Sequence, residues 1–198
     1  MSLIRMTEFF LKQDLSGVEI QKLIGKPPVL YSDLVKYKNL SSLLPKSSPY
    51  CVILYQNTKY EGHYVSIFID SDGCINFQDS YSYGPDVPIN EGLLPFDSPL
   101  KRYLSNLIQK SGRKLITNTT DYQSHKKDTA DCGRYAWLRI LLRDISNDDF
   151  KSLLTSSKLT NSFLTPDNIA VLLTLIGLDD ITTFFKRGST PFMKKITR

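Results

Sequence analysis

One stretch of the sequence has the pattern of a β-hairpin, and it constrains the fold more than any other. Gly62–Asp70 is rich in β-branched and aromatic residues, Ser71-Asp72-Gly73 is a turn sequence, and Cys74–Asp79 is a second short strand. Opposite residues of an antiparallel hairpin have a constant index sum. The indices of His63 and Asp79 sum to 142, and a turn centred on the first two turn residues gives about 143. We therefore expect His63 and Asp79 to lie opposite each other, to within one residue, on one face of the sheet.

This pair forms one half of a candidate catalytic site. A carboxylate beside an imidazole orients it as a base. Cys132 lies just before a helical segment, where the helix dipole and unpaired N–H groups favour a thiolate. The backbone N–H of Cys132 and the side-chain amide of Gln123 are candidate donors to an oxyanion. Gly133 would permit close approach of a substrate backbone.

Other residues offer alternatives for these roles. Asn118 is a substitute for Gln123, and His125 is the other candidate base, although it lies in a lysine-rich loop without an orienting strand partner. His63 beside Asp79 could also be an ordinary cross-strand pair, and Cys132 an ordinary buried thiol. Cys51 and Cys74 are expected to be core thiols on strands.

Length and composition favour a single globular domain. The chain has 198 residues, 41% hydrophobic residues and a net charge of +5, and its basic character permits contact with DNA without demanding it. Three cysteines without a CxxC pair, and only two histidines, predict a reducing compartment and neither a disulfide framework nor a metal site. We find no signal-peptide pattern and no apolar run of membrane-spanning length, so the sequence predicts neither secretion nor a membrane span.

Hydrophobic periodicity predicts an α+β fold, a central mixed β-sheet flanked by helices, with a buried helix carrying Cys132. The domain divides into an N-terminal helical and loop segment (1–48), a core (49–143) and a C-terminal helical segment with a basic tail (144–198). The expected strands are 50–55, 62–70, 74–79 and 113–121, and a long loop spans 80–98. The expected helices are 15–24, capped by Ser16 and ended by Gly25, a ragged one over 31–44, then 99–111, 133–143, 149–156, 165–176 ended by Gly177, and a last short one around Phe184 and Phe185.

The order of these residues resembles the adenovirus-type cysteine proteases. That family includes the SUMO-deconjugating (Ulp1-like) proteases and the maturation proteases of virophages, polintons and large DNA viruses. The order His63, Asp79, Gln123, Cys132-Gly133 matches the family order, and the match covers roughly residues 50–140. The family usually has Trp where this chain has Tyr64, and the gap from Gln123 to Cys132 is a few residues longer than usual.

The resemblance implies a papain-like, adenain-like fold and a cysteine endopeptidase. His63 would be the base, Asp79 its orienter, Cys132 the nucleophile and Gln123 the oxyanion donor, with Tyr64 and Gly133 lining a narrow substrate cleft. Capsid or core precursors would be cut at Gly-type sites during virion maturation, inside the virion and host cell, by a monomer. No cofactor would be required, although DNA or a peptide could activate the enzyme, and Cys51 or Cys74 could tether that peptide. The alternatives are an isopeptidase for a ubiquitin-like modifier, an acyltransferase on the same fold, and a binding module that keeps only the scaffold.

Overall fold

The computed structural model describes residues 9–57, 62–87, 102–124, 130–155 and 164–186. Its sheet has the strand order β1 (Val29–Leu30), β2 (Tyr50–Gln56), β3 (Gly62–Ile69), β4 (Ile75–Gln78) and β5 (Leu115–Thr117). The three central strands are antiparallel, whereas β1 and β5 run parallel to their neighbours. The predicted α+β fold with a central mixed sheet is therefore confirmed.

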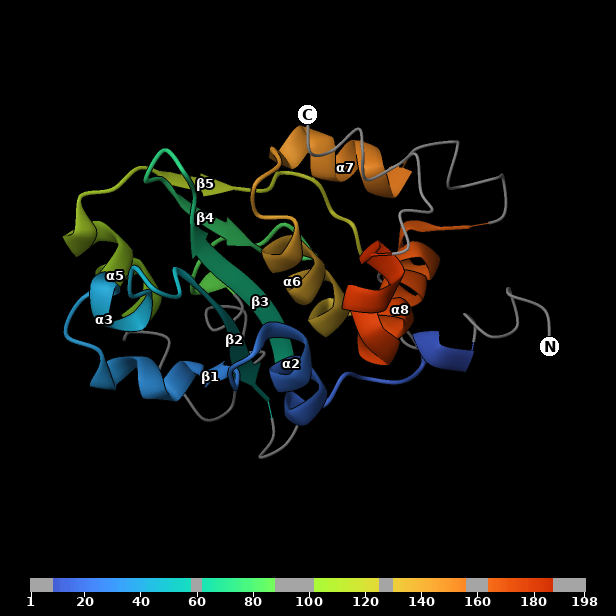
Figure 1. Ribbon diagram of the computed structural model, residues 1–198. Coiled ribbons are helices and arrows are strands. Elements are labelled where there is room, and N and C mark those ends of the chain that lie inside the picture. Colours follow the sequence, from blue (N-terminus) through green and yellow to red (C-terminus); the bar gives the residue numbers. More distant parts are fainter. Residues whose placement is uncertain (1–8, 58–61, 88–101, 125–129, 156–163, 187–198) are drawn as a thin grey trace.

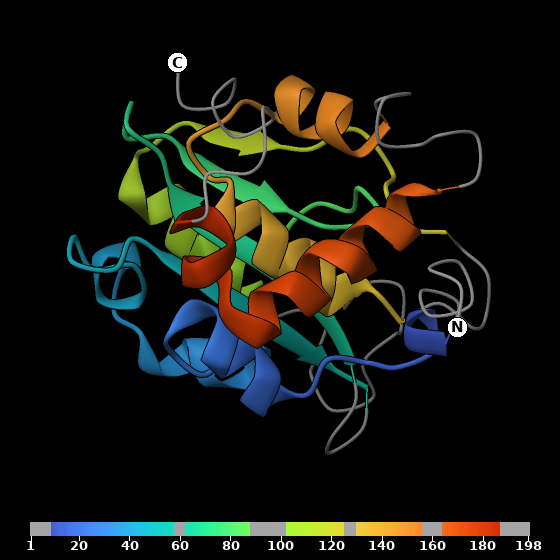
Figure 2. The same ribbon diagram turned by 45° about the vertical axis from the view of Figure 1, so that its right-hand side comes forward.

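Helices cover both faces of the sheet (Figure 1). The 3₁₀ helix η1 (Tyr31–Lys36), α3 (Leu40–Leu43) and α5 (Tyr103–Ser111) lie on one side. The other side holds α2 (Gly17–Ile24), α6 (Cys132–Leu141), α7 (Asn147–Thr155) and α8 (Pro166–Lys186). Figure 2 shows α6 against the sheet, with α8 crossing over it.

Alternation along the strands gives each face its own core. Val65 and Ile67 of β3 belong to the cluster around η1, α3 and α5, whereas Tyr64 belongs to the cluster around α2, α6 and α8. The helix α6 is buried on nearly every side, as its sequence predicted, and Trp137 is only 1% exposed. This burial fixes the N-terminal end of α6 relative to the N-terminal end of β3.

Several predicted boundaries hold and others do not. Ser16 and Glu19 form a capping box at the start of α2, and Gly25 ends that helix with φ of +79°. The ragged helix predicted over 31–44 is instead η1 followed by α3, and residues 29–30 add an unpredicted strand beside β2. The helices predicted over 99–111, 133–143 and 149–156 are 103–111, 132–141 and 147–155, and the strand predicted over 113–121 is 115–117. Residues 88–98 of the predicted loop lie outside the described residues.

The last helix continues through Gly177, so the prediction that it ends there is wrong. A glycine inside a helix costs about 1 kcal/mol relative to alanine, which weakens a helix without ending it where apolar residues continue on both sides. The separate short helix around Phe184 and Phe185 is therefore the end of α8. The predicted helix start is confirmed, because the backbone N–H of Asn168 donates to Oγ1 of Thr165 over 3.2 Å.

Candidate active site

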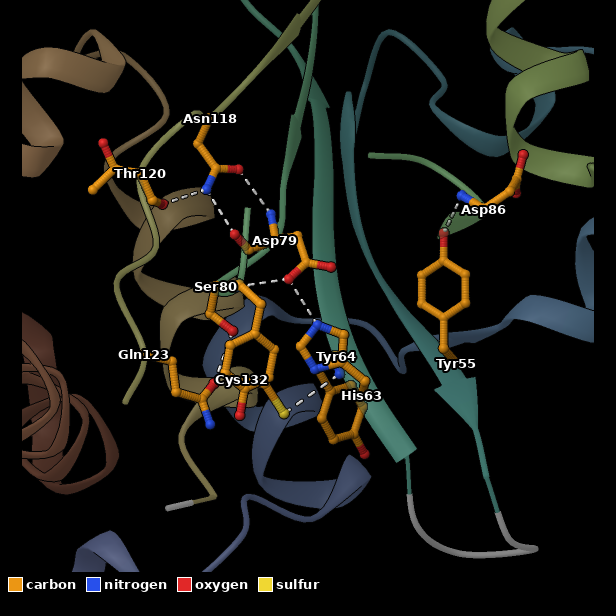
Figure 3. Close-up of polar contacts among 11 residues, drawn as sticks. Tyr55, His63, Tyr64, Asp79, Ser80, Asp86, Asn118, Thr120, Gln123 and Cys132 are labelled. Carbon is orange, nitrogen blue, oxygen red and sulfur yellow. Dashed lines mark hydrogen bonds and ion pairs between the residues drawn. The ribbon is translucent and has the colours of Figure 1, made fainter. Parts of the chain in front are cut away.

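Cys132 is the first residue of α6 and lies beside the N-terminal end of β3 (Figure 3). Its thiol is half-buried, and the backbone N–H of Tyr64 donates to its sulfur over 3.5 Å. The N–H groups in the first turn of a helix have no intrahelical acceptor, and the helix dipole adds positive potential there. Both features stabilise negative charge on the sulfur.

His63 lies between Cys132 and Asp79 (Figure 3). Its Nε2 is 2.9 Å from Oδ1 of Asp79, and the carboxylate is fully buried while the imidazole is 17% exposed. The structure therefore brings together the three residues that the sequence paired by index arithmetic and helix position. The ring nitrogen that does not face Asp79 is the one left for the sulfur.

The register of the hairpin differs from the expected one. Paired residues of β3 and β4 have an index sum of 144, because Ser66 pairs with Gln78 and Ile69 with Ile75. Continuing that register places Asp79 opposite Val65 rather than His63. The cause is the turn, which has three residues and not two: Gly73 has φ of +78°, and the Asp70 N–H donates to the Cys74 carbonyl. A shift of two keeps Asp79 on the same face, so the imidazole still reaches it.

The imidazole is held in its charged form. Burial lowers the pKa of His63, but hydrogen bonding to Asp79 and Cys132 and the charges of both outweigh it and raise the pKa to about 10. Near neutral pH the ring therefore carries a proton that it can later give to a leaving group.

Gln123 lies beside this group and is held by Ser80. The Ser80 hydroxyl donates to Oε1 of Gln123 over 2.8 Å, and the Gln123 backbone N–H donates to the Ser80 carbonyl. Because its oxygen already accepts this bond, the amide presents its NH₂ as the donor end. That orientation is the one an oxyanion donor needs.

Asn118, the alternative donor, has a different function in the structure. Its Oδ1 accepts from the Asp79 N–H over 3.0 Å, and its Nδ2 donates to the carbonyls of Asp79 and Thr120 (Figure 3). Both ends of this buried amide are engaged, so Asn118 does not serve as an oxyanion donor. It extends the backbone pairing by one residue beyond β4 and thereby fixes Asp79.

A cleft of about 210 Å³ opens beside Cys132. Its walls include Tyr64, Cys132 and Gly133, together with residues of the segment before α2. Gly133 is buried, and a Cβ there would lie 3.3 Å from Leu15, Ile20 and Tyr64. Its lack of a side chain therefore lets α2 and β3 pack against α6. The full set of lining residues is Asp14, Leu15, Ser16, Gly62, Tyr64, Ala130, Cys132 and Gly133.

The remaining predicted residues lie apart from this group. Cys51 is buried on β2, as predicted, and burial raises the pKa of its thiol to about 12. Cys74 is half-buried in the hairpin turn rather than on a core strand. His125, the alternative base, lies outside the described residues. Within the described ranges, no cluster of His, Cys, Asp and Glu could hold a metal ion, and no helix has the length and apolar character to cross a membrane.

Sequence reasoning missed Tyr81, whose ring stacks on the imidazole of His63 with a centroid distance of 5.3 Å. The only signal available was position, since Tyr81 comes two residues after Asp79 and its neighbourhood was read as loop. It also missed Ser80 as the partner of Gln123, because that contact joins residues 43 positions apart.

Comparison with known proteins gives one sequence relative of interest. The chain is 29% identical over 175 residues to the uncharacterized protein V9 of Sputnik virophage, and the alignment covers 85% of this chain and 98% of V9. No protein-family model matches the sequence. The relationship is a distant homology, and V9 has no assigned function.

Solved structures show only weak similarity. The central domain of the uncharacterized Lpg1148 protein from Legionella pneumophila has a TM-score of 0.44 and 12% identity, over 85% of this chain and 99% of that one. A structure of the SUMO protease Ulp1 has a TM-score of 0.32 and 18% identity, and the match covers 87% of this chain and 77% of that one. A de-sumoylating protease has a TM-score of 0.31 and 20% identity, and the match covers 94% of this chain and 83% of that one. With TM-scores this low, these three chains support no functional conclusion.

Proposed function

We propose that this chain is a papain-like, adenain-like cysteine endopeptidase in which Cys132 is the nucleophile. The observation that carries the proposal is the contact series Cys132, His63, Asp79, in which a thiol at a helix N-terminus faces an imidazole bonded to a buried carboxylate. This arrangement activates a sulfur nucleophile and supplies a general acid within one group. Groups of the chain and a water molecule fill every role in the proposed reaction, so the proposal includes no cofactor.

In the proposed reaction, the Cys132 thiolate attacks the carbonyl carbon of a peptide bond. The C–S bond forms, and the carbonyl π electrons move to oxygen, where the Cys132 N–H and the Gln123 amide stabilise the negative charge. The C–N bond then breaks, and the leaving amine takes the proton of His63. Water attacks the resulting thioester and gives its proton to the neutral imidazole, and the thiolate leaves.

The cleft beside Cys132 supports substrates with small residues next to the cut. Its volume of about 210 Å³ is below the roughly 300–1,000 Å³ of ordinary ligand pockets. A peptide backbone with glycine or a similarly small residue fits such a space, whereas a large side chain meets Tyr64 or the segment before α2. We therefore propose cleavage at Gly-type sites, with Tyr64 and Gly133 contributing to the cleft.

The distant relationship to a virophage protein supports a viral setting for the proposed reaction. We propose that the substrates are capsid or core precursor proteins, processed by a monomer in the virion and the host cell interior. The net charge of +5 supports DNA as an additional contact that could activate the enzyme.

The test is intact mass after incubation with a thiol-directed peptide electrophile ending in Gly-Gly. The parent should gain one adduct, and Cys132→Ala and His63→Ala should gain none. Cys74→Ala is the matched control, because it removes a half-buried thiol away from the cleft. An adduct that persists in Cys132→Ala, with or without DNA, would show that the nucleophile is assigned wrongly.

Two substrate panels separate the proposal from its alternatives. A maturation protease should cleave short peptides and precursor proteins, whereas an isopeptidase should react far better with a folded ubiquitin-like probe. An acyltransferase should consume acyl-CoA in a Cys132-dependent reaction. Cleavage of short Gly-containing peptides, absent in Cys132→Ala, supports the protease.

A further inference from the structure

Three consecutive residues after β4 each contact a different part of the candidate active site. Asp79 is hydrogen-bonded to His63, Ser80 is hydrogen-bonded to Gln123, and Tyr81 stacks on the imidazole. The proposed mechanism uses the first directly and the second through Gln123, but it gives no role to the third. Tyr81 is therefore the residue of this group whose contribution has to be explained.

Tyr81 contacts both members of the His63–Asp79 pair. Its ring lies nearly parallel to the imidazole, with 24° between the planes and 5.3 Å between the centroids. Its backbone N–H donates to Oδ1 of Asp79 over 2.8 Å, so that oxygen serves Tyr81 and His63 together. Burial and the nearby charges, that of Cys132 foremost, raise the pKa of the phenol to about 12, so the ring stays neutral.

The loop that carries Tyr81 is fixed at its far end by a buried carboxylate. Asp86 accepts from the hydroxyl of Tyr31 over 2.6 Å and from the N–H of Ser105 over 2.9 Å. Its own N–H donates to the hydroxyl of Tyr55, a residue that pairs with His63 across β2 and β3. The loop is thus tied to the strand beside the imidazole.

Backbone strain indicates that this loop conformation is held and not merely tolerated. Ser82 and Asp86 have φ of +56° and +66°, in the left-handed region that residues with a Cβ rarely adopt. Such a conformation is strained and persists only where the surroundings over-determine it. At Asp86 the surroundings are the bonds to Tyr31, Tyr55 and the first turn of α5.

We propose that Tyr81 is a positioning residue whose ring covers the outer face of the His63 imidazole. The cover keeps one ring nitrogen on Asp79 and the other towards Cys132, and it excludes water from the hydrogen bond between His63 and Asp79. A dry bond is electrostatically stronger, and a ring that cannot rotate spends more time in the reactive orientation. The inference rests on the proposed function.

The test compares substitutions that keep the ring with others that remove it. Tyr81→Phe should retain kcat to within about twofold, whereas Tyr81→Leu and Tyr81→Met should lower kcat about tenfold or more with KM nearly unchanged. The matched control is Tyr83→Leu, because that ring contacts Tyr81 at 6.1 Å and is not stacked on His63. A change in KM with kcat unchanged would overturn the proposal, and so would equal decreases in kcat for Tyr83→Leu and Tyr81→Leu.

A second measurement on His63 does not require turnover. Solvent exchange of the imidazole N–H protons, followed by NMR, should be at least about tenfold faster in Tyr81→Leu and Tyr81→Met than in the parent, and unchanged in Tyr81→Phe. Two ring-removing variants guard against one that fails to fold, which thermal unfolding identifies. If the parent gives no Cys132 adduct, the proposed function fails, and unchanged exchange in a folded variant overturns the role of Tyr81 separately.

Discussion

The sulfur of Cys132 contributes to the charged state of the His63 imidazole. The sulfur is among the groups that raise the pKa of His63 to about 10, from an ordinary value of 6.5. In Cys132→Ala that hydrogen bond and charge are lost, so we expect the pKa of His63 to fall. An NMR titration of the ring nitrogens checks this, with Cys74→Ala as the control. An unchanged pKa would mean that Asp79 alone accounts for the shift.

The same pKa predicts how stability varies with pH. Because the folded-state pKa of His63 is above its ordinary value, its pairing contributes full stability below about pH 6.5. The contribution is lost as the pH rises through about 10. Urea unfolding between those pH values should show the parent losing more stability than His63→Ala. Parallel curves for the two proteins would contradict this prediction.

Ser80 offers a test of how Gln123 is oriented. In Ser80→Ala the hydroxyl that donates to Oε1 is absent, so the amide can turn its oxygen towards the developing negative charge. Complete loss of an oxyanion donor costs about 100- to 1,000-fold in kcat, and we expect the partial misorientation in Ser80→Ala to cost roughly tenfold. Ser111→Ala, which removes a hydroxyl bonded to the Ile108 carbonyl on α5, should leave kcat unchanged. Equal rates for the parent and Ser80→Ala would argue against Gln123 as the donor.

At the scale of elements, the sequence predicts what depends on local pattern. The hairpin, the capped α2 and the buried α6 follow from periodicity, turn residues and caps, and so does the shared face of His63 and Asp79. The exact register does not, because it depends on whether Gly73 adopts a left-handed conformation. The anchor at Asp86 is equally hidden, since its partner Tyr31 is 55 residues away.

Gly133 connects three elements, and its replacement should disturb all of them. In Gly133→Ala the new Cβ meets side-chain atoms of Leu15, Ile20 and Tyr64 at 3.3 Å, so these side chains must give way by a few tenths of an ångström. Overpacking of this kind costs about 1–3 kcal/mol, which urea unfolding would detect. Gly17→Ala is the control, because its Cβ meets only ordinary contacts at 3.5 Å and beyond. A variant as stable as the parent would show that the elements adjust freely.

The segment before α2 gives the cleft a charge preference. Asp14 is exposed and lines the cleft beside Cys132, so it should favour a peptide with Lys over one with Glu at a position outside the Gly-type residues at the cut. An exposed ion pair is worth at most about 1 kcal/mol, which predicts a roughly two- to fivefold preference in kcat/KM. Asp14→Asn should abolish it, and Asp72→Asn, in the hairpin turn, should not. No preference in the parent would exclude Asp14 from substrate contact.

At the scale of the whole molecule, one buried ion pair connects the N-terminal segment to α6, which begins at Cys132. Arg134 bonds Asp131 through Nε over 2.8 Å, and its Nη2 donates to the carbonyls of Phe10 and Gln13. The segment that includes the cleft wall at Leu15 is therefore attached to α6 at Arg134, two residues after Cys132. Cys132 and this wall of the cleft therefore form a single unit.

Removing Arg134 tests this unit and has a definite pH dependence. Burial raises the pKa of Asp131 to about 7 although Arg134 opposes the shift, so the ionised carboxylate costs stability as the pH rises from about 4 to about 7. In Arg134→Met that pKa rises further, and about 3–5 kcal/mol should be lost where Asp131 is ionised. The loss should be larger at pH 8 than at pH 5.

The double variant Arg134→Met/Asp131→Asn separates the charge from the packing. It leaves no carboxylate to ionise at position 131, so its stability should no longer depend on this titration, and part of the loss at pH 8 should be recovered. Urea unfolding of the parent, Arg134→Met, Asp131→Asn and the double variant at pH 5 and pH 8 measures the coupling. We expect Arg134→Met to raise the KM for peptides, because the carbonyls of Phe10 and Gln13 lose the donor that holds the segment in place. The double variant still lacks that donor, so its KM should be raised as well. If KM returns to the parent value along with stability, the cleft wall is positioned without Arg134.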